Sequence, residues 1–114
     1  MVLKGHSMKK LLQEARAEIE KGWSQGNFFE FKDGTHTNSI GNRRNITKCC
    51  MIGAIILHDL KYDERYGAQA RELLRDIIGE RLGVRDIVYF NDKVAKSKEE
   101  VLEVFDEAIR RASD

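Results

Sequence analysis

The spacing of apolar residues is the feature of this sequence that most limits its fold. In four segments these residues recur every three or four positions, which predicts amphipathic helices over residues 8–21, 47–60, 64–82 and 98–112. The second segment is apolar on nearly every side, so we expect it to be buried at the centre. The sequence therefore predicts a single, mainly α-helical domain over residues 8–112, with about four helices around a buried central helix.

The ends and faces of these helices carry their own signals. Ser97 and Glu100 have the spacing of a capping box, which predicts that the last helix begins after Ser97. Gly22 directly follows the first periodic segment, where glycine commonly adopts a left-handed conformation that ends a helix. Glu18 and Lys21, three positions apart, are expected to pair on the polar face of that first helix.

Two short segments rich in β-forming residues predict a small two-stranded element. Residues 27–32 lead into Asp33 and Gly34, a dipeptide suited to the positive φ of a tight turn. Residues 87–90 are too short for a helix and read Ile-Val-Tyr-Phe. We expect them to form a buried strand that pairs with residues 28–31.

Composition and charge narrow the class of protein. The chain has 114 residues, 41% of them hydrophobic, which is enough for one core without disulfides or a structural metal. Its net charge of +1 creates no overall field that would draw it to nucleic acid or to an anionic membrane. The longest apolar run, Cys49 to Leu57, is far shorter than the ~18 residues of a membrane span. We therefore expect a soluble protein.

The first residues bear on the compartment. Residues 1–7 lack the apolar stretch and the small-residue cleavage site of a signal peptide, so we expect a cytoplasmic protein. Because Met8 directly follows Gly5-His6-Ser7, residues 1–7 are expected to be an N-terminal extension or a remnant of cloning.

Five short segments, in their order and spacing, resemble a family of small uncharacterised bacterial and phage domains. They are Gly22–Gly26 (GWxxG), Cys50–Ala54 (CxxGA), Phe90–Asp92 (FND), Ser97–Val101 and Asp106–Ile109. The resemblance covers about residues 8–112, and family members carry a tryptophan where this chain has Phe90. Because that family has no assigned activity, the resemblance implies a fold unit and a bacterial or phage source but no chemistry.

The adjacent cysteines are the one candidate for catalysis. Cys49 and Cys50 lie at the predicted start of the second helix, where the helix dipole would lower a thiol pKa. His36 or His58 could act as a base, and Asp92 could orient it. Free cysteines in an apolar segment are more often packed in the core, so we expect Cys50 to be buried and inert and Cys49 to react faster. Neither Cys-x-x-Cys nor His-x-x-x-His spacing occurs, so we expect no metal site and no cofactor.

A basic segment before the second helix is the best candidate for a ligand site. Arg43, Arg44 and Lys48 surround the predicted helix start, where unpaired backbone N–H groups and the helix dipole favour an anion. The backbone N–H of Thr47 would donate to that anion, and the arginines would add charge-assisted bonds. The alternative is a solvated basic loop that makes only surface ion pairs.

Aromatic and polar residues elsewhere could complete such a site. Trp23 and Phe28 could stack on the ligand, which would suit a nucleotide better than free phosphate. Asn91 and Asp92 follow the predicted second strand and could reach a cleft. A turn is the favoured interpretation of this pair, because both side chains hydrogen-bond to their own nearby backbone.

The sequence thus predicts a small, non-catalytic binding module. Its expected partner is an anionic ligand, nucleotide-like or phosphorylated, or an acidic protein surface. A cysteine-dependent enzyme that uses Cys49 or Cys50 is one alternative. A nucleic-acid-binding domain is another, and the balanced charge disfavours it.

Overall fold

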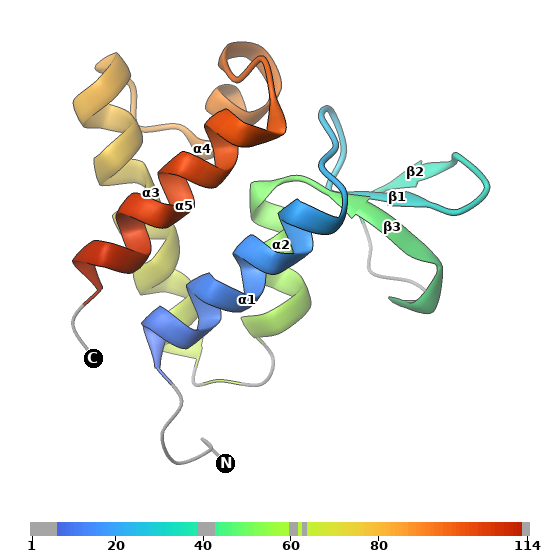
Figure 1. The fold of residues 1–114 in the computed structure, drawn as a ribbon, viewed down its shortest axis with the longest axis horizontal. Coiled ribbons are helices and arrows are strands. Elements are labelled where there is room, and N and C mark those ends of the chain that lie inside the picture. The colour runs from blue at the N-terminus through green and yellow to red at the C-terminus, as the bar shows by residue number, and fades with distance from the viewer. Residues whose placement is uncertain (1–6, 39–42, 60–61, 63, 113–114) are drawn as a thin grey trace.

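The computed structural model describes residues 7–38, 43–59, 62 and 64–112. In that part of the chain, four longer helices form most of the molecule, and a three-stranded antiparallel sheet projects to one side (Figure 1). The mainly helical class is confirmed. The elements, in chain order, are α1 (Met8–Lys21), β1 (Phe29–Phe31), β2 (His36–Thr37), the 3₁₀ helix η1 (Arg43–Asn45), β3 (Ile46–Cys49), α2 (Met51–Asp59), α3 (Glu64–Leu82), α4 (Ile87–Tyr89), the π-helix η2 (Phe90–Val94) and α5 (Lys98–Arg111).

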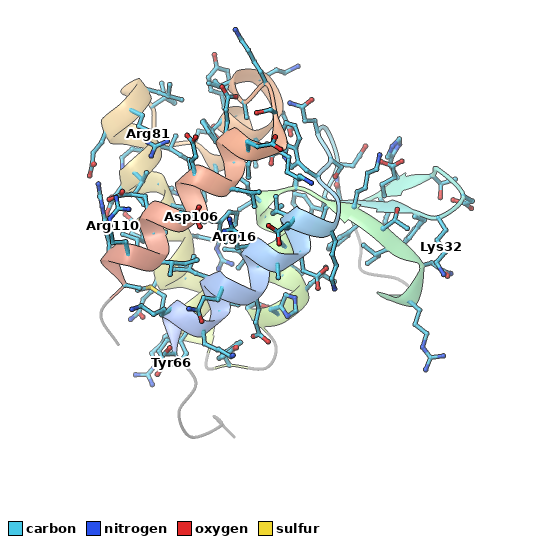
Figure 2. The ribbon with its side chains drawn as sticks, viewed as in Figure 1. Arg16, Lys32, Tyr66, Arg81, Asp106 and Arg110 are labelled. Carbon is cyan, nitrogen blue, oxygen red and sulfur yellow. The ribbon has the colours of Figure 1, made fainter. Side chains whose placement is uncertain are left out.

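The first helix, rather than the second, is the element on which the other long helices pack. α1 contacts α2, α3 and α5 and lies between α2 and α5 in Figure 1. On its flank, Arg16 reaches Asp106 of α5 at 2.5 Å (Figure 2). α2 packs against α1, α3, α4 and β3 and is mostly buried, but Ile52 and Ile56 are only partly covered. The buried stripe of α1 consists of Leu11, Leu12, Ala15 and Ile19.

Three of the predicted helices lie where the sequence places them, as α1, α3 and α5. The Ser97 hydroxyl accepts a hydrogen bond from the Glu100 N–H, as a capping residue should. Gly22 does end α1, but in an extended conformation with φ of -176° instead of the expected left-handed one. A Cβ atom there would lie 2.3 Å from the carbonyl oxygen of Thr47. Glycine is therefore required because the end of α1 lies directly against β3.

The second helix begins later than predicted. Residues 46–49 form strand β3, and α2 starts only at Met51. Strand pairing overrides the helical pattern here: β3 pairs antiparallel with β1, with Phe29 opposite Cys49. The strand ends when the Cys50 N–H donates to the carbonyl of Phe28, and the Cys50 Sγ then accepts from the Gly53 N–H. The β-branched side chains at the start of β3 favour this extended conformation.

Residues 87–90 do not form the predicted strand. Residues 87–89 form α4, and Phe90 begins η2, which follows directly. Asp86 starts the turn, because its carboxylate accepts from the Tyr89 N–H. The Ala95 N–H donates to the carbonyl of Phe90, which closes a wide turn of π-helical type. A local cap therefore outweighed the strand propensity of this segment.

The sheet has three strands within the described residues, in the order β2-β1-β3. The expected tight turn joins β1 to β2: Gly34 has a φ of +87°, and Asp33 accepts hydrogen bonds from Thr35. Phe29 of β1 is fully buried and ties the sheet to the helical core. No helix in the described part of the chain is long and apolar enough to cross a membrane.

Candidate ligand-binding site

The residues predicted to bind a ligand fall into two groups. The first group lies on η1 and β3 and consists of Arg43, Arg44, Thr47 and Lys48. The side chain of Arg43 is outside the described part of the structure, and the other three residues are exposed. The second gathers around η2 and consists of Trp23, Asn91 and Asp92. Phe28 is half-buried, with its ring edge-on against Phe29 at 6.3 Å between centroids.

Asn91 is the centre of the second group and is only 1% exposed. Its Oδ1 accepts from the Trp23 indole N–H at 2.9 Å and from the Met51 N–H at 3.1 Å. Its Nδ2 donates to the carbonyl of Ser24 at 3.0 Å and to Asp92 Oδ1 at 2.8 Å. An amide side chain offers two donor hydrogens and one acceptor oxygen with two lone pairs, so Asn91 has no capacity left for a ligand.

The neighbours of Asn91 complete a polar junction between three distant parts of the chain. Asp92 Oδ1 accepts from the Gly26 N–H, and Gln25 Nε2 donates to the carbonyls of Asn91 and Ala95. We call Trp23, Ser24, Gln25, Asn91 and Asp92 the Asn91 junction. It joins the Gly22–Gly26 segment, the start of α2 and η2, which are three of the segments that carry the family resemblance. Gln25 was not predicted as a site residue, although it belongs to one of these segments.

A pocket beside this junction contains two residues of the first group. It has a volume of about 180 Å³ and lies between the end of α1, strand β3 and α2. Thr47 and Lys48 contribute to its wall, and Glu18 and Lys21 approach from the last turns of α1. The remaining lining is Ile46, Cys49 and Leu57. The ion pair expected on the outer face of the first helix therefore lines a pocket, because β3 packs beside it.

Charges of both signs meet at this pocket. Glu18 Oε1 lies 3.0 Å from His58 Nε2 and 3.6 Å from the Lys21 ammonium group. Lys48 Nζ lies 3.8 Å from Glu30, and both partners are solvent-accessible, so this pair is weak. The Thr47 hydroxyl donates to the carbonyl of Glu30 and retains only acceptor capacity. The two ammonium groups are thus the donors available to a ligand anion.

Comparison with known proteins places the chain in a family. A model of a family of unknown function, DUF6197, matches residues 4–111. The chain belongs to DUF6197. No curated protein and no solved structure gives a significant match.

The two cysteines of this DUF6197 chain are buried free thiols. Cys49, at 1% exposure, is more deeply buried than Cys50, at 5%, so the expected order of accessibility is wrong. Burial raises the pKa of both thiols, and the Glu18 carboxylate raises that of Cys49 further. The expected lowering by a helix start fails because Cys49 belongs to a strand and desolvation dominates at both positions. Among the described residues no cluster could hold a metal ion.

We predict that neither thiol reacts in the folded DUF6197 chain. The raised pKa values leave almost no thiolate near neutral pH, and both sulfur atoms are shielded from the reagent. An aromatic disulfide reagent should modify two thiols in denaturant and neither under native conditions. Modification within seconds in folded protein would contradict this and would revive the cysteine-dependent alternative.

Proposed function

We propose that the protein is a non-catalytic binding module whose ligand is a small molecule with an anionic group. Its site is the pocket between the end of α1 and β3. The observation that carries this proposal is that Lys21 and Lys48, from two separate elements, line one pocket with the apolar side chains of Ile46 and Leu57. A few convergent polar groups in a small concavity are a feature of small-molecule sites.

The start of α2, where the sequence suggested an anion would bind, is already occupied by protein groups. The Met51 N–H donates to Asn91, and the Gly53 N–H donates to the Cys50 sulfur. Thr47 lies on β3, before the helix, so the expected donor is not a helix-start N–H. We therefore place the anion site in the pocket rather than at the start of α2.

The size of the pocket favours a ligand smaller than a nucleotide. Its volume of about 180 Å³ lies below the ~300–1,000 Å³ of sites that enclose drug-sized molecules. The aromatic cover expected for a base is also committed elsewhere. The Trp23 indole donates to Asn91, and the Phe28 ring packs on Phe29.

Small anions should stabilise the protein through this pocket. Inorganic phosphate and propionate are the probes, and a ligand at 100 times its Kd raises the unfolding free energy by about 2.7 kcal/mol. The double variant Lys21→Ala/Lys48→Ala should lose the shift in melting temperature, because it removes both ammonium groups. The matched control Lys32→Ala/Lys93→Ala removes the same charge from exposed positions outside the pocket and should keep the shift. Equal shifts in both variants, or none in the parent protein, would overturn the proposal.

A further inference from the structure

Among the described residues, Glu18 is the one acid that lines the pocket, and a site for a simple anion does not explain it. Its side chain is 23% exposed, and Oε1 is the carboxylate oxygen nearest to both His58 and Lys21. Within the described part of the chain, no hydrogen bond involves Oε2. The pocket thus offers one carboxylate oxygen as an acceptor in addition to two ammonium donors.

A purely anionic ligand would meet repulsion at this carboxylate. Its negative group, drawn to Lys21 and Lys48, would enter a small pocket that Glu18 also lines, where like charges disfavour each other. A ligand that also carries a protonated amine removes this conflict, because the amine can donate to Oε2. Its anionic group can then bind the lysines.

We propose that the ligand is a small zwitterion of the amino-acid class, an inference that rests on the proposed binding function. The ammonium group binds Glu18, and the carboxylate binds Lys21 and Lys48. A short aliphatic side chain packs on Ile46, Cys49 and Leu57, and the volume of about 180 Å³ limits its length.

Three pairs of probes, each differing only by the ammonium group, isolate the contribution of Glu18. They are glycine with acetate, L-alanine with propionate, and L-2-aminobutyrate with butyrate. A hydrogen bond between charged groups changes affinity by about tenfold or more, so at least one amino acid should bind about tenfold more tightly than its matched acid. Calorimetric titration of the parent protein measures these ratios without any variant.

The substitution Glu18→Gln assigns the preference to the carboxylate. Glutamine keeps an oxygen that can accept from His58 but removes the charge, so the ratio within each pair should fall to about one. Glu103→Gln, at an exposed position on α5, should leave the ratios unchanged. Circular dichroism melting checks that both variants fold.

The outcomes separate this inference from the function on which it rests. Equal affinity for amino acids and their matched acids in the parent protein overturns the zwitterion and leaves the anion site standing. Phosphate binding without any amino-acid binding has the same consequence. If no probe binds, both proposals fail. A ratio that survives Glu18→Gln also overturns the inference, because the ammonium group is then recognised elsewhere.

Discussion

Replacing Asn91 by alanine is expected to destabilise the protein by about 3–5 kcal/mol, because it removes the centre of a buried polar junction. The Trp23 indole N–H, the Met51 N–H and the Ser24 carbonyl all lose their partner. Each unpaired buried group costs about 1–3 kcal/mol, and water entering the vacated space recovers part of that. Urea denaturation followed by the fluorescence of Trp23, the only tryptophan, measures the loss directly.

The matched control for Asn91→Ala lies in the same π-helix. Lys93 is exposed, and Lys93→Ala should change the unfolding free energy by no more than about 0.5 kcal/mol. The comparison separates the loss of the junction from any general sensitivity of η2. A loss below about 1 kcal/mol for Asn91→Ala would show that the junction contributes little to stability.

The sequence predicts those parts of the fold that depend on local patterns. The apolar stripes of α1, α3 and α5 reflect their burial, and the cap at Ser97 and the Asp33-Gly34 turn need only near neighbours. The helix prediction for residues 47–49 failed because these residues directly adjoin the apolar run that continues into α2 and were counted as the first turn of that helix. Only pairing with β1, which lies more than a dozen residues upstream, decides that they form a strand. The prediction for residues 87–90 failed although the deciding signal, the Asp86 cap, is local, because the prediction relied on the β propensity of the segment instead.

The candidate site was predicted only in part because its parts come from distant segments. Thr47 and Lys48 were named from the charge of their own segment. Glu18 and Lys21 could be predicted as an ion pair but not as site residues, since nothing in α1 indicates which strand will lie beside its polar face. For Asn91 the sequence suggested either a turn bonded to nearby backbone or a ligand contact, whereas its partners Ser24 and Met51 are 67 and 40 positions away.

The junction and the pocket are mechanically connected. The Cys49 N–H donates to the carbonyl of Gly22, and the Ser24 N–H donates to the carbonyl of Cys49. These bonds fasten the end of α1 to β3, and the Asn91 junction holds Trp23 and Ser24 on the other side. Lys21 and Lys48 therefore project from backbones whose separation the core determines. Such preorganisation lowers the entropic cost of ordering the site when a small ligand binds.

Replacing glycine by alanine should affect the free energy of unfolding differently at Gly79 in α3 and at Gly53 in α2. Alanine forms helices better than glycine by about 1 kcal/mol, so Gly79→Ala in α3 should be neutral or stabilising. Its new Cβ would lie 2.7 Å from Cγ of Arg85, whose exposed side chain must rotate and weaken its surface ion pairs with Glu72 and Asp76, while no backbone has to move. In α2, a Cβ at Gly53 would lie 2.4 Å from the carbonyl oxygen of Phe28 and 3.1 Å from the buried ring of Phe29.

The Phe28 carbonyl cannot retreat from Gly53, because it accepts the Cys50 N–H that ends β3 at the start of α2. Gly53→Ala must therefore push the sheet away from α2, and overpacking of this kind costs about 1–3 kcal/mol or more. The gain of about 1 kcal/mol in helix propensity offsets part of this cost, so we expect a net loss of about 1–2 kcal/mol at Gly53 and none at Gly79, measured by urea denaturation of both variants. Equal effects at the two positions would mean that the contact between the Phe28 carbonyl and α2 is loose, and that the sheet is not fixed against the helices as the pocket requires.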